Sequence, residues 1–188
     1  MKSRIDTAKI TMYNKNTILC LFGMGINEMA KENKTNAMRK LDSMKISYKE
    51  HYYVDSGAIA GVDVAKALGE NPDHVFKTLV TEGKSGNHYV FLVPVAEELD
   101  LKKAAAVVGE KSVAMLKSKD LLGLTGYIHG GCSPIGMKKF FRTTIHSSAA
   151  ECETIFCSGG KIGFQIELTP DDLAKVITFQ FHDIIKNS

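Results

Sequence analysis

Residues 126–136 read Gly-Tyr-Ile-His-Gly-Gly-Cys-Ser-Pro-Ile-Gly and hold four glycines and one proline. Glycine adopts φ > 0 without steric cost and lets a ligand approach the backbone closely, whereas Pro134 fixes its own φ and lacks an N–H donor. Backbone N–H groups in such a loop can form a concavity that binds an anion. A lone glycine pair more often marks a plain turn between strands, so this loop alone leaves both interpretations open.

Two other stretches favour a binding site. Residues 158–163 form a second glycine loop, Ser-Gly-Gly-Lys-Ile-Gly, and residues 75–80 read Val-Phe-Lys-Thr-Leu-Val. The latter stretch places a lysine among apolar side chains. Two glycine loops together with such a lysine predict a pocket for a negatively charged group.

Lys77 is the strongest single candidate for a functional residue. Successive side chains of a strand face opposite sides, so Lys77 would share one face with Val75 and Leu79. An unpaired buried ammonium is strongly disfavoured, which makes a lysine uncommon on such a face. The alternative is an edge-strand lysine whose stem lies along apolar surface while its head reaches water. The strand pattern alone supports both interpretations about equally.

Several spaced motifs follow one another along the chain. They are Phe76-Lys77-Thr78-Leu79, Pro94-Val95, Leu99-Asp100-Leu101-Lys102-Lys103, Gly126-Tyr127, Gly130-Gly131-Cys132-Ser133-Pro134-Ile135-Gly136-Met137-Lys138-Lys139 and Ser158-Gly159-Gly160-Lys161. Together they resemble the YbaK/EbsC family, relatives of the editing domain of bacterial prolyl-tRNA synthetase. An ordered set of motifs is far more specific than one glycine pattern. The resemblance runs from about Lys34 to about Ile185.

The resemblance implies a freestanding aminoacyl-tRNA deacylase that removes cysteine mischarged onto tRNA(Pro), with Cys-tRNA(Cys) as a further candidate substrate. In the implied mechanism, the thiol of the substrate's own cysteine attacks the aminoacyl ester and expels the tRNA. Positioning then supplies most of the acceleration, because a well-oriented intramolecular attack can lower a barrier by roughly 7–11 kcal/mol. The resemblance implies no cofactor and no metal. Its implied partners are aminoacyl-tRNA and, as a second candidate, prolyl-tRNA synthetase.

The resemblance also implies roles for individual residues. Lys77 would hold the charged end of the substrate near the scissile ester, and backbone donors between Gly130 and Pro134 would bind the ester carbonyl oxygen as an oxyanion hole does. The implied substrate-binding residues are Tyr53, Thr78, Gly130, Gly131, Pro134, Ser158, Gly159 and Gln165. Some relatives carry an acid at the position of Gln165. The amide in this chain argues against a carboxylate general base there.

Other side chains invite a nucleophile interpretation that the sequence does not support. No histidine is placed by the sequence to activate Cys132, and a structural role for this cysteine is favoured. His129 and His146 match no catalytic residue implied by the resemblance. A nucleophile elbow would need Gly-x-Ser-x-Gly between a strand and a helix, whereas Ser158 precedes a glycine pair in an expected strand-to-strand turn. We therefore interpret the Ser158 hydroxyl as a substrate hydrogen-bonding group.

Composition narrows the class of protein. The 188 residues are 44% hydrophobic and 24% charged, as is ordinary for one soluble globular domain. The formal net charge of +3 is compatible with an RNA partner but too small to require one. The cysteines lack zinc-site spacing and are too few for a disulfide scaffold, which predicts reduced thiols and a cytoplasmic location. They are Cys20, Cys132, Cys152 and Cys157.

Residues 1–33 do not match the rest of the chain. Their apolar run, 18–26, is much shorter than the roughly 20 residues that span a bilayer, and no small-residue cleavage site follows it. Met29 opens a segment that would serve as a natural start. The expected organisation is therefore an extension over 1–33, disordered or non-native, followed by one editing-type domain over 34–188.

Periodicity and turn residues predict an α+β fold with a mixed, largely antiparallel sheet flanked by helices. Helices are expected over about 35–45, capped by Asn33 or Thr35, over 62–68, over 100–108, capped by Asp100 or Glu98, and over 118–122. A further helix should begin at Thr169-Pro170, with Phe181, Ile184 and Ile185 extending its packing. Strands are expected over 48–54, 75–81, 88–93, 112–115, 143–145, 153–157 and 164–168. The resemblance adds that the sheet is curved and barrel-like.

Three other functions remain open on the sequence alone. One is a deacylase for another amino acid, such as alanine on tRNA(Pro), which would have to recruit water. Another is a non-catalytic module that binds aminoacyl-tRNA or a synthetase. The last is a nucleotide- or phosphate-binding domain, but neither glycine loop has the spacing of a phosphate-binding loop or a dinucleotide fingerprint.

Overall fold

The structure is a computed structural model that describes residues 34–53 and 61–186. From Thr35 onward the chain forms one unit. The extension expected over residues 1–33 and the placement of Cys20 lie outside the described residues.

The described residues contain five α-helices, two short 3-10 helices and eight strands. The helices are α3 (Asn36–Ser43), α4 (Gly61–Leu68), η4 (Pro72–His74), α5 (Leu101–Val108), α6 (Ser118–Thr125), η5 (Ser147–Glu151) and α7 (Pro170–Val176). The strands are β1 (Lys49–Tyr52), β2 (Phe76–Gly83), β3 (His88–Pro94), β4 (Val113–Met115), β5 (Arg142–His146), β6 (Ile155–Ser158), β7 (Phe164–Leu168) and β8 (Phe179–His182).

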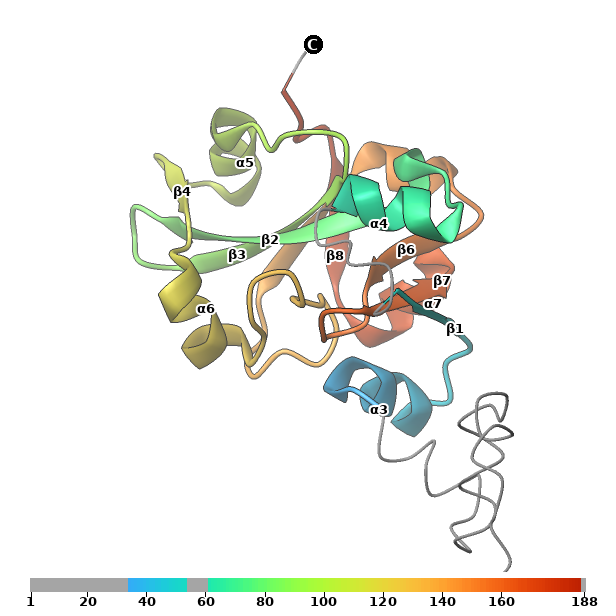
Figure 1. Ribbon diagram of the computed structural model, residues 1–188. Coiled ribbons are helices and arrows are strands. Elements are labelled where there is room, and N and C mark those ends of the chain that lie inside the picture. The colour runs from blue at the N-terminus through green and yellow to red at the C-terminus, as the bar shows by residue number, and fades with distance from the viewer. Residues whose placement is uncertain (1–33, 54–60, 187–188) are drawn as a thin grey trace, which may run out of the picture. The chain divides into compact units, whose positions relative to one another are not determined.

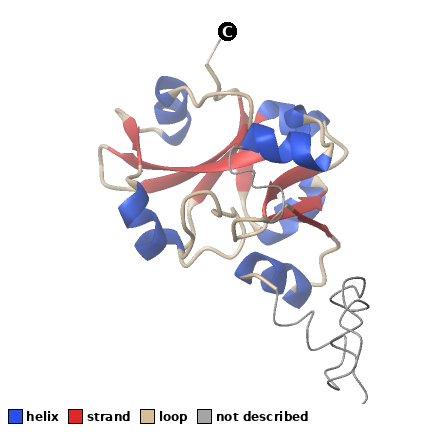
Figure 2. Cartoon of the chain, in the orientation of Figure 1, coloured by secondary structure: helices blue, strands red, loops and turns tan. Residues whose placement is uncertain are grey.

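The strands form two sheets (Figure 1). One has five strands in the order β4-β2-β3-β5-β8, and the other has three in the order β1-β7-β6. Among the described pairs, β3–β5 and β5–β8 are parallel, and the other four are antiparallel. Figure 2 shows the helices around the outside of these strands. The expected α+β class, with mixed and largely antiparallel pairing, is confirmed.

The barrel-like sheet implied by the resemblance is not confirmed. The described strands form two open sheets, and a parallel bridge between Val75 and Phe156 joins the start of β2 to β6. A barrel requires the pairing to continue until the first strand meets the last. The described strands show no such closure.

Helix boundaries follow local capping signals. The Thr35 hydroxyl accepts a hydrogen bond from the backbone N–H of Met38 and caps α3, and the Asp100 carboxylate caps α5. Thr169 caps α7, whose first residue is the proline that the sequence marks as a helix start. These caps confirm the expected starts of the three helices, with Thr35 rather than Asn33 as the first cap.

The β2–β3 hairpin is the centre of the fold. β3 is buried along nearly its whole length, and its alternate residues face different groups of apolar side chains. Val90 and Leu92 pack in a cluster with residues of α3 and α6, whereas Phe91 and Val93 pack in a cluster with residues of α5. A strand with helices on both faces explains why the sequence shows a continuous apolar run here rather than an alternation.

The end of the chain differs from expectation. Phe181, Ile184 and Ile185 do not extend a helix. β8 runs parallel to β5 with Phe179 opposite Thr143, and Ile184 is buried in the α5 cluster. Alternating aromatic residues suit a strand, but the partner strand lies more than thirty residues earlier in the sequence. Local periodicity therefore could not reveal the pairing.

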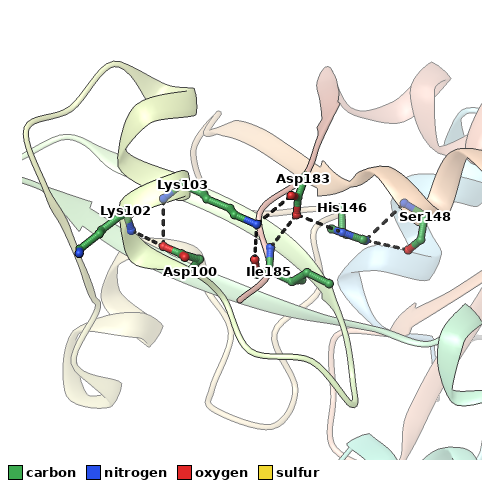
Figure 3. A network of polar contacts seen from close by, with 7 residues as sticks. All are labelled: Asp100, Lys102, Lys103, His146, Ser148, Asp183 and Ile185. Atoms are coloured by element: carbon green, nitrogen blue, oxygen red, sulfur yellow. Dashed lines mark hydrogen bonds and ion pairs between the residues drawn. The ribbon is translucent and has the colours of Figure 1, made fainter. Parts of the chain in front are cut away.

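A surface network holds the segment after β8, and we call it the C-terminal clasp (Figure 3). The Lys103 ammonium lies 2.8 Å from Asp183 Oδ2 and donates to the carbonyl oxygen of Ile185 at 2.8 Å. His146 Nε2 lies 3.7 Å from Asp183 Oδ1, and its Nδ1 contacts the Ser148 hydroxyl. The clasp joins α5, β5 and the last described residues.

None of the helices in the described residues has the length and apolar character that a bilayer crossing requires.

Candidate active site

A cavity of about 280 Å³ opens where the start of β2 approaches the three-stranded sheet. Its apolar wall comes mainly from Val64, Val75, Val95, Leu116, Leu121 and Phe164. Its polar and glycine lining contains six of the nine predicted site residues: Tyr53, Lys77, Thr78, Gly130, Ser158 and Gln165. The fold thus brings together residues up to 112 positions apart in the sequence.

Lys77 is the cation of this cavity lining. Its side chain is half-buried, and its Nζ donates to the carbonyl oxygen of Val95 at 3.1 Å. Burial lowers its pKa, and the carboxylates of Glu98 and Glu97 oppose that shift. An ammonium has three donor hydrogens, so one is used to orient the side chain and two can contact a ligand.

Thr78 presents an unused polar group beside the lysine. Its Oγ1 is buried and has no hydrogen-bond partner among the described residues. A buried hydroxyl without a partner costs free energy, and a ligand that supplies the partner recovers it. Because Thr78 lines the cavity, a polar ligand group there would both bind and satisfy this hydroxyl.

The first glycine loop reaches the cavity through His129, Gly130 and Cys132. Gly131 and Pro134 are buried in the loop but are not part of the cavity wall. The N–H of Gly131 donates to the carbonyl oxygen of Ile128 at 3.1 Å, and a side chain on Gly131 would press on the backbone of Lys161. Gly131 therefore lets the two glycine loops pack closely.

Tyr127 fixes the relative position of the two glycine loops, a role that the sequence did not reveal. The buried phenol donates to the carbonyl oxygen of Ile135 at 2.6 Å. Gly136 (φ 74°) lies against its hydroxyl and Gly160 (φ 94°) against its ring, with 2.9 Å from the position of a hypothetical Cβ in both cases. Both positions therefore exclude larger residues by conformation and by space.

The second glycine loop is held from two sides. Ser158 Oγ accepts from the N–H of Gly160 at 3.2 Å, and the Thr35 hydroxyl donates to the carbonyl oxygen of Gly159. The N–H of Tyr53 donates to the carbonyl oxygen of Gly163 at 3.0 Å. Ser158 and Tyr53 line the cavity, whereas Gly159 packs against the backbone of Phe164 outside the lining.

The thiol at the cavity is poorly suited to be a nucleophile. Cys132 is 7% exposed, and burial raises the pKa of its thiol to about 12. A thiol with such a pKa is protonated near neutral pH and therefore unreactive. His129 is exposed at the cavity, whereas His146 belongs to the C-terminal clasp (Figure 3).

Gln165 connects the cavity to a polar network that the sequence did not indicate. Its amide faces the carboxylate of Glu70, which lies near the His51 imidazole, and His51 contacts Glu167 in turn. We call these four residues the cavity network. In the sequence, Glu70 follows a helix-ending glycine and looks like a solvated surface residue. Its role becomes visible only through its contact with Gln165, 95 positions later.

Comparisons with known proteins identify the family of this chain. Residues 58–176 match the family model described as "Aminoacyl-tRNA editing domain". An Enterococcus faecalis protein named "Putative Cys-tRNA(Pro)/Cys-tRNA(Cys) deacylase EbsC" is 45% identical over 81% of this chain and 94% of its own length.

Two solved structures share the fold. One is described as "Crystal structure of a putative trans-editing enzyme for prolyl tRNA synthetase", with a TM-score of 0.71 and 22% identity over 81% of this chain and 96% of that one. The other comes from work on grafting epitopes onto scaffold proteins, with the same TM-score and 24% identity over the same shares of the two chains. The family match covers more than half of the sequence and contains every residue of the cavity lining except Tyr53. This chain belongs to the aminoacyl-tRNA editing domain family.

Proposed function

We propose that this protein is a freestanding deacylase that cleaves cysteine from mischarged tRNA(Pro), and also from tRNA(Cys). The observation that carries the proposal is a single cavity lined by the Lys77 ammonium, the unsatisfied Thr78 hydroxyl and Gly130 of the first glycine loop. The 45% identity to a protein named for this activity supports the choice of substrate. Cleavage would take place in the cytoplasm, where aminoacyl-tRNA is made and used.

The substrate supplies the nucleophile in this proposal. The cysteine thiol loses its proton, its sulfur forms a bond to the ester carbonyl carbon, and the bond from that carbon to the ribose oxygen breaks. The thiol proton is balanced by the one that the departing ribose oxygen gains. The products are free tRNA and a four-membered cyclic thioester of cysteine. Holding sulfur and carbonyl carbon together is the main catalytic demand, which a positioning cavity can meet.

The cavity residues have matching tasks. Lys77 attracts the negatively charged nucleotide end of the substrate and keeps it near the ester, and the backbone at Gly130 donates to the carbonyl oxygen as negative charge develops on it. Cys132 remains a protonated thiol and does not compete with the substrate sulfur. Gln165 is an amide, which cannot accept a proton as a general base. This composition favours thiol assistance over activation of water.

The test is deacylation of a panel of aminoacyl-tRNAs by the purified protein. We expect cleavage of Cys-tRNA(Pro) and slow cleavage of Ser-tRNA(Pro), because a thiol is a few per cent ionised at neutral pH and a hydroxyl is not. S-methylated Cys-tRNA(Pro) should bind but resist cleavage. Sparing of Cys-tRNA(Pro) while Ala-tRNA(Pro) is hydrolysed would replace the proposal with a water-dependent deacylase.

Prolyl-tRNA synthetase is the proposed partner that presents the substrate. The panel is therefore run with and without this synthetase. A rate on Cys-tRNA(Pro) that rises only in its presence supports such presentation. Equal rates on Cys-tRNA(Pro) and Cys-tRNA(Cys) in both conditions would mean that the deacylase acts alone on the aminoacyl end. Binding without turnover in either condition would identify a non-catalytic module.

A further inference from the structure

Glu70 is a buried carboxylate directly behind the cavity wall. It follows α4, and its side chain is only 5% exposed. Gln165, which lines the cavity from β7, is 4% exposed and lies between Glu70 and the cavity. Glu70 therefore influences a ligand through the amide of Gln165.

The contact between these two side chains fixes which way the amide points. When the amide nitrogen of Gln165 faces Glu70, it donates to Glu70 Oε2 at 3.0 Å and to Oε1 at 3.2 Å. The opposite orientation would set the amide oxygen against the two carboxylate oxygens, which are all acceptors. With the nitrogen committed to Glu70, the group that Gln165 has left for a ligand is its oxygen, a pure acceptor.

Glu70 is held in place by the other residues of the cavity network. His51 Nδ1 from β1 lies 3.8 Å from Glu70 Oε1, and His51 Nε2 lies 2.9 Å from Glu167 Oε2 on β7. Glu167 also accepts from Lys49 at 3.0 Å and from Thr154 at 3.1 Å. A network with this many partners resists rotation, so the amide of Gln165 is held by a rigid support.

We propose that Glu70 is a positioning residue that fixes the Gln165 amide with its oxygen towards the cavity, where it accepts a hydrogen bond from the α-ammonium of the aminoacyl ester. This inference rests on the proposed function. Among the donors of a cysteinyl ester, the ammonium is the charged one and gains most from an acceptor backed by carboxylates. Lys77 repels the ammonium from β2, whereas Gln165 lies on the other sheet, so the two ends of the substrate are separated.

The same contact makes the orientation depend on pH. Burial, helped by the negative charge of Glu167, raises the pKa of Glu70 to about 7, and the hydrogen bond from Gln165 opposes that rise. The groups that face Glu70 are His51 from β1 and both Gln165 and Glu167 from β7. Once protonated, Glu70 can donate to the amide oxygen. Gln165 would then turn its nitrogen to the cavity and repel the ammonium.

The first experiment compares substrates and variants in steady-state deacylation. The wild type should cleave Cys-tRNA(Pro) about tenfold to hundredfold faster, in kcat/KM, than 3-mercaptopropionyl-tRNA(Pro), which keeps the thiol and lacks the amino group. Glu70→Gln permits both orientations of the Gln165 amide and should lose several-fold on Cys-tRNA(Pro) but not on the analogue. Adding Gln165→Glu to Glu70→Gln returns an oxygen to the cavity and should restore the discrimination.

The outcomes separate the two proposals. Equal wild-type rates on the two substrates, or a double variant no better than Glu70→Gln, would overturn the positioning role and leave the deacylase function standing. Absence of any cleavage by the wild type would overturn the proposed function instead.

A second measurement does not depend on turnover. The side-chain amide resonance of Gln165, assigned by its loss in Gln165→Leu, should shift with a midpoint near the pKa of Glu70 in the wild type and not in Glu70→Gln. A midpoint that persists in Glu70→Gln would mean that another group, such as His51, controls the amide, and it would refute the proposal even if a variant were poorly active.

Discussion

The cavity network and the C-terminal clasp contain the same kinds of side chain and behave in opposite ways. Each sets a carboxylate near a histidine, Glu70 near His51 and Asp183 near His146. Glu70 is 5% exposed and Asp183 is 60% exposed. Burial raises the pKa of Glu70, whereas the hydrogen bond from Lys103 lowers the pKa of Asp183. The presence of an acid–histidine pair therefore does not by itself indicate a functional site. Its burial and its cationic partners determine whether the pair supports a ligand site or only stabilises the fold.

The largest expected effect lies on the cavity side of this comparison. Lys77→Ala should reduce deacylation of Cys-tRNA(Pro) by about a hundredfold or more, because it removes the cation of the cavity lining. Its fold should survive, since the lysine is half-buried and its Nζ makes one hydrogen bond to the protein. Single-turnover rates measure the activity, and thermal melting measures the stability of the fold. Lys84→Ala in the exposed hairpin loop is the matched control. Unchanged activity would remove Lys77 from the site.

The next effect concerns stability. A substitution in the cavity network should raise the free energy of unfolding, whereas a substitution in the C-terminal clasp should lower it. Glu70 has a pKa of about 7 in the folded chain against an ordinary value of 4.5. The folded state thus binds more protons between these values, and the stability contributed by Glu70 is complete below about pH 4.5 and is lost as the pH rises through 7. The glutamine of the Glu70→Gln variant cannot ionise. At pH 8 the free energy of unfolding of this variant should therefore exceed that of the wild type by roughly 1–3 kcal/mol.

Urea unfolding at pH 5 and pH 8 checks this prediction. The advantage of Glu70→Gln should shrink at pH 5, where the wild-type carboxyl is mostly protonated. A variant that is less active but more stable would show that Glu70 is kept for function rather than for folding. A loss of stability at pH 8 would show that the carboxylate fastens the fold, as the clasp does.

Cys132→Ala should have a smaller effect. We expect deacylation to stay within about threefold of the wild type, because the nucleophile belongs to the substrate and the enzyme thiol is held protonated. Stability should fall by about 1 kcal/mol through the small cavity that the missing sulfur leaves. Rate measurements and mass spectrometry of the quenched reaction test this. A covalent cysteinyl adduct on Cys132 would instead establish enzyme-based nucleophilic catalysis.

How much of this the sequence could predict depends on the range of the interactions. α5 was predictable because its Asp100 cap and the Gly109 that follows it are local signals. The β6–β7 hairpin was predictable for the same reason, since the Gly159-Gly160 turn lies between two apolar runs. β8 was missed because its character comes from parallel pairing with β5, which no local pattern encodes.

The cavity shows the same limit. Lys77 stood out because a cation within an apolar strand is locally anomalous, and the cavity lining includes it. Glu70 did not stand out, and Tyr127 appeared only as part of a motif, because their importance comes from contacts with Gln165 and with two separate glycine loops. Motifs along the chain can identify residues that contact a ligand, but residues that support them from behind become visible only in three dimensions.

The smallest expected effect lies in the C-terminal clasp. Lys103→Met keeps the aliphatic stem and removes the contacts with Asp183 and with the carbonyl oxygen of Ile185, both at 2.8 Å. Because Asp183 is 60% exposed, solvent screens the pair, and the loss of stability should be smaller than the loss expected for Cys132→Ala. In 1 M salt the difference should shrink further, since screening already weakens the wild-type pair. Urea unfolding at low and high salt measures this loss of stability, with exposed Lys102→Met as the control.

In Lys103→Met, amide exchange near Ile185 should accelerate while rates on Cys-tRNA(Pro) stay unchanged. A Lys103→Met variant that lost deacylation as Lys77→Ala does would show that the clasp and the cavity network act together rather than separately.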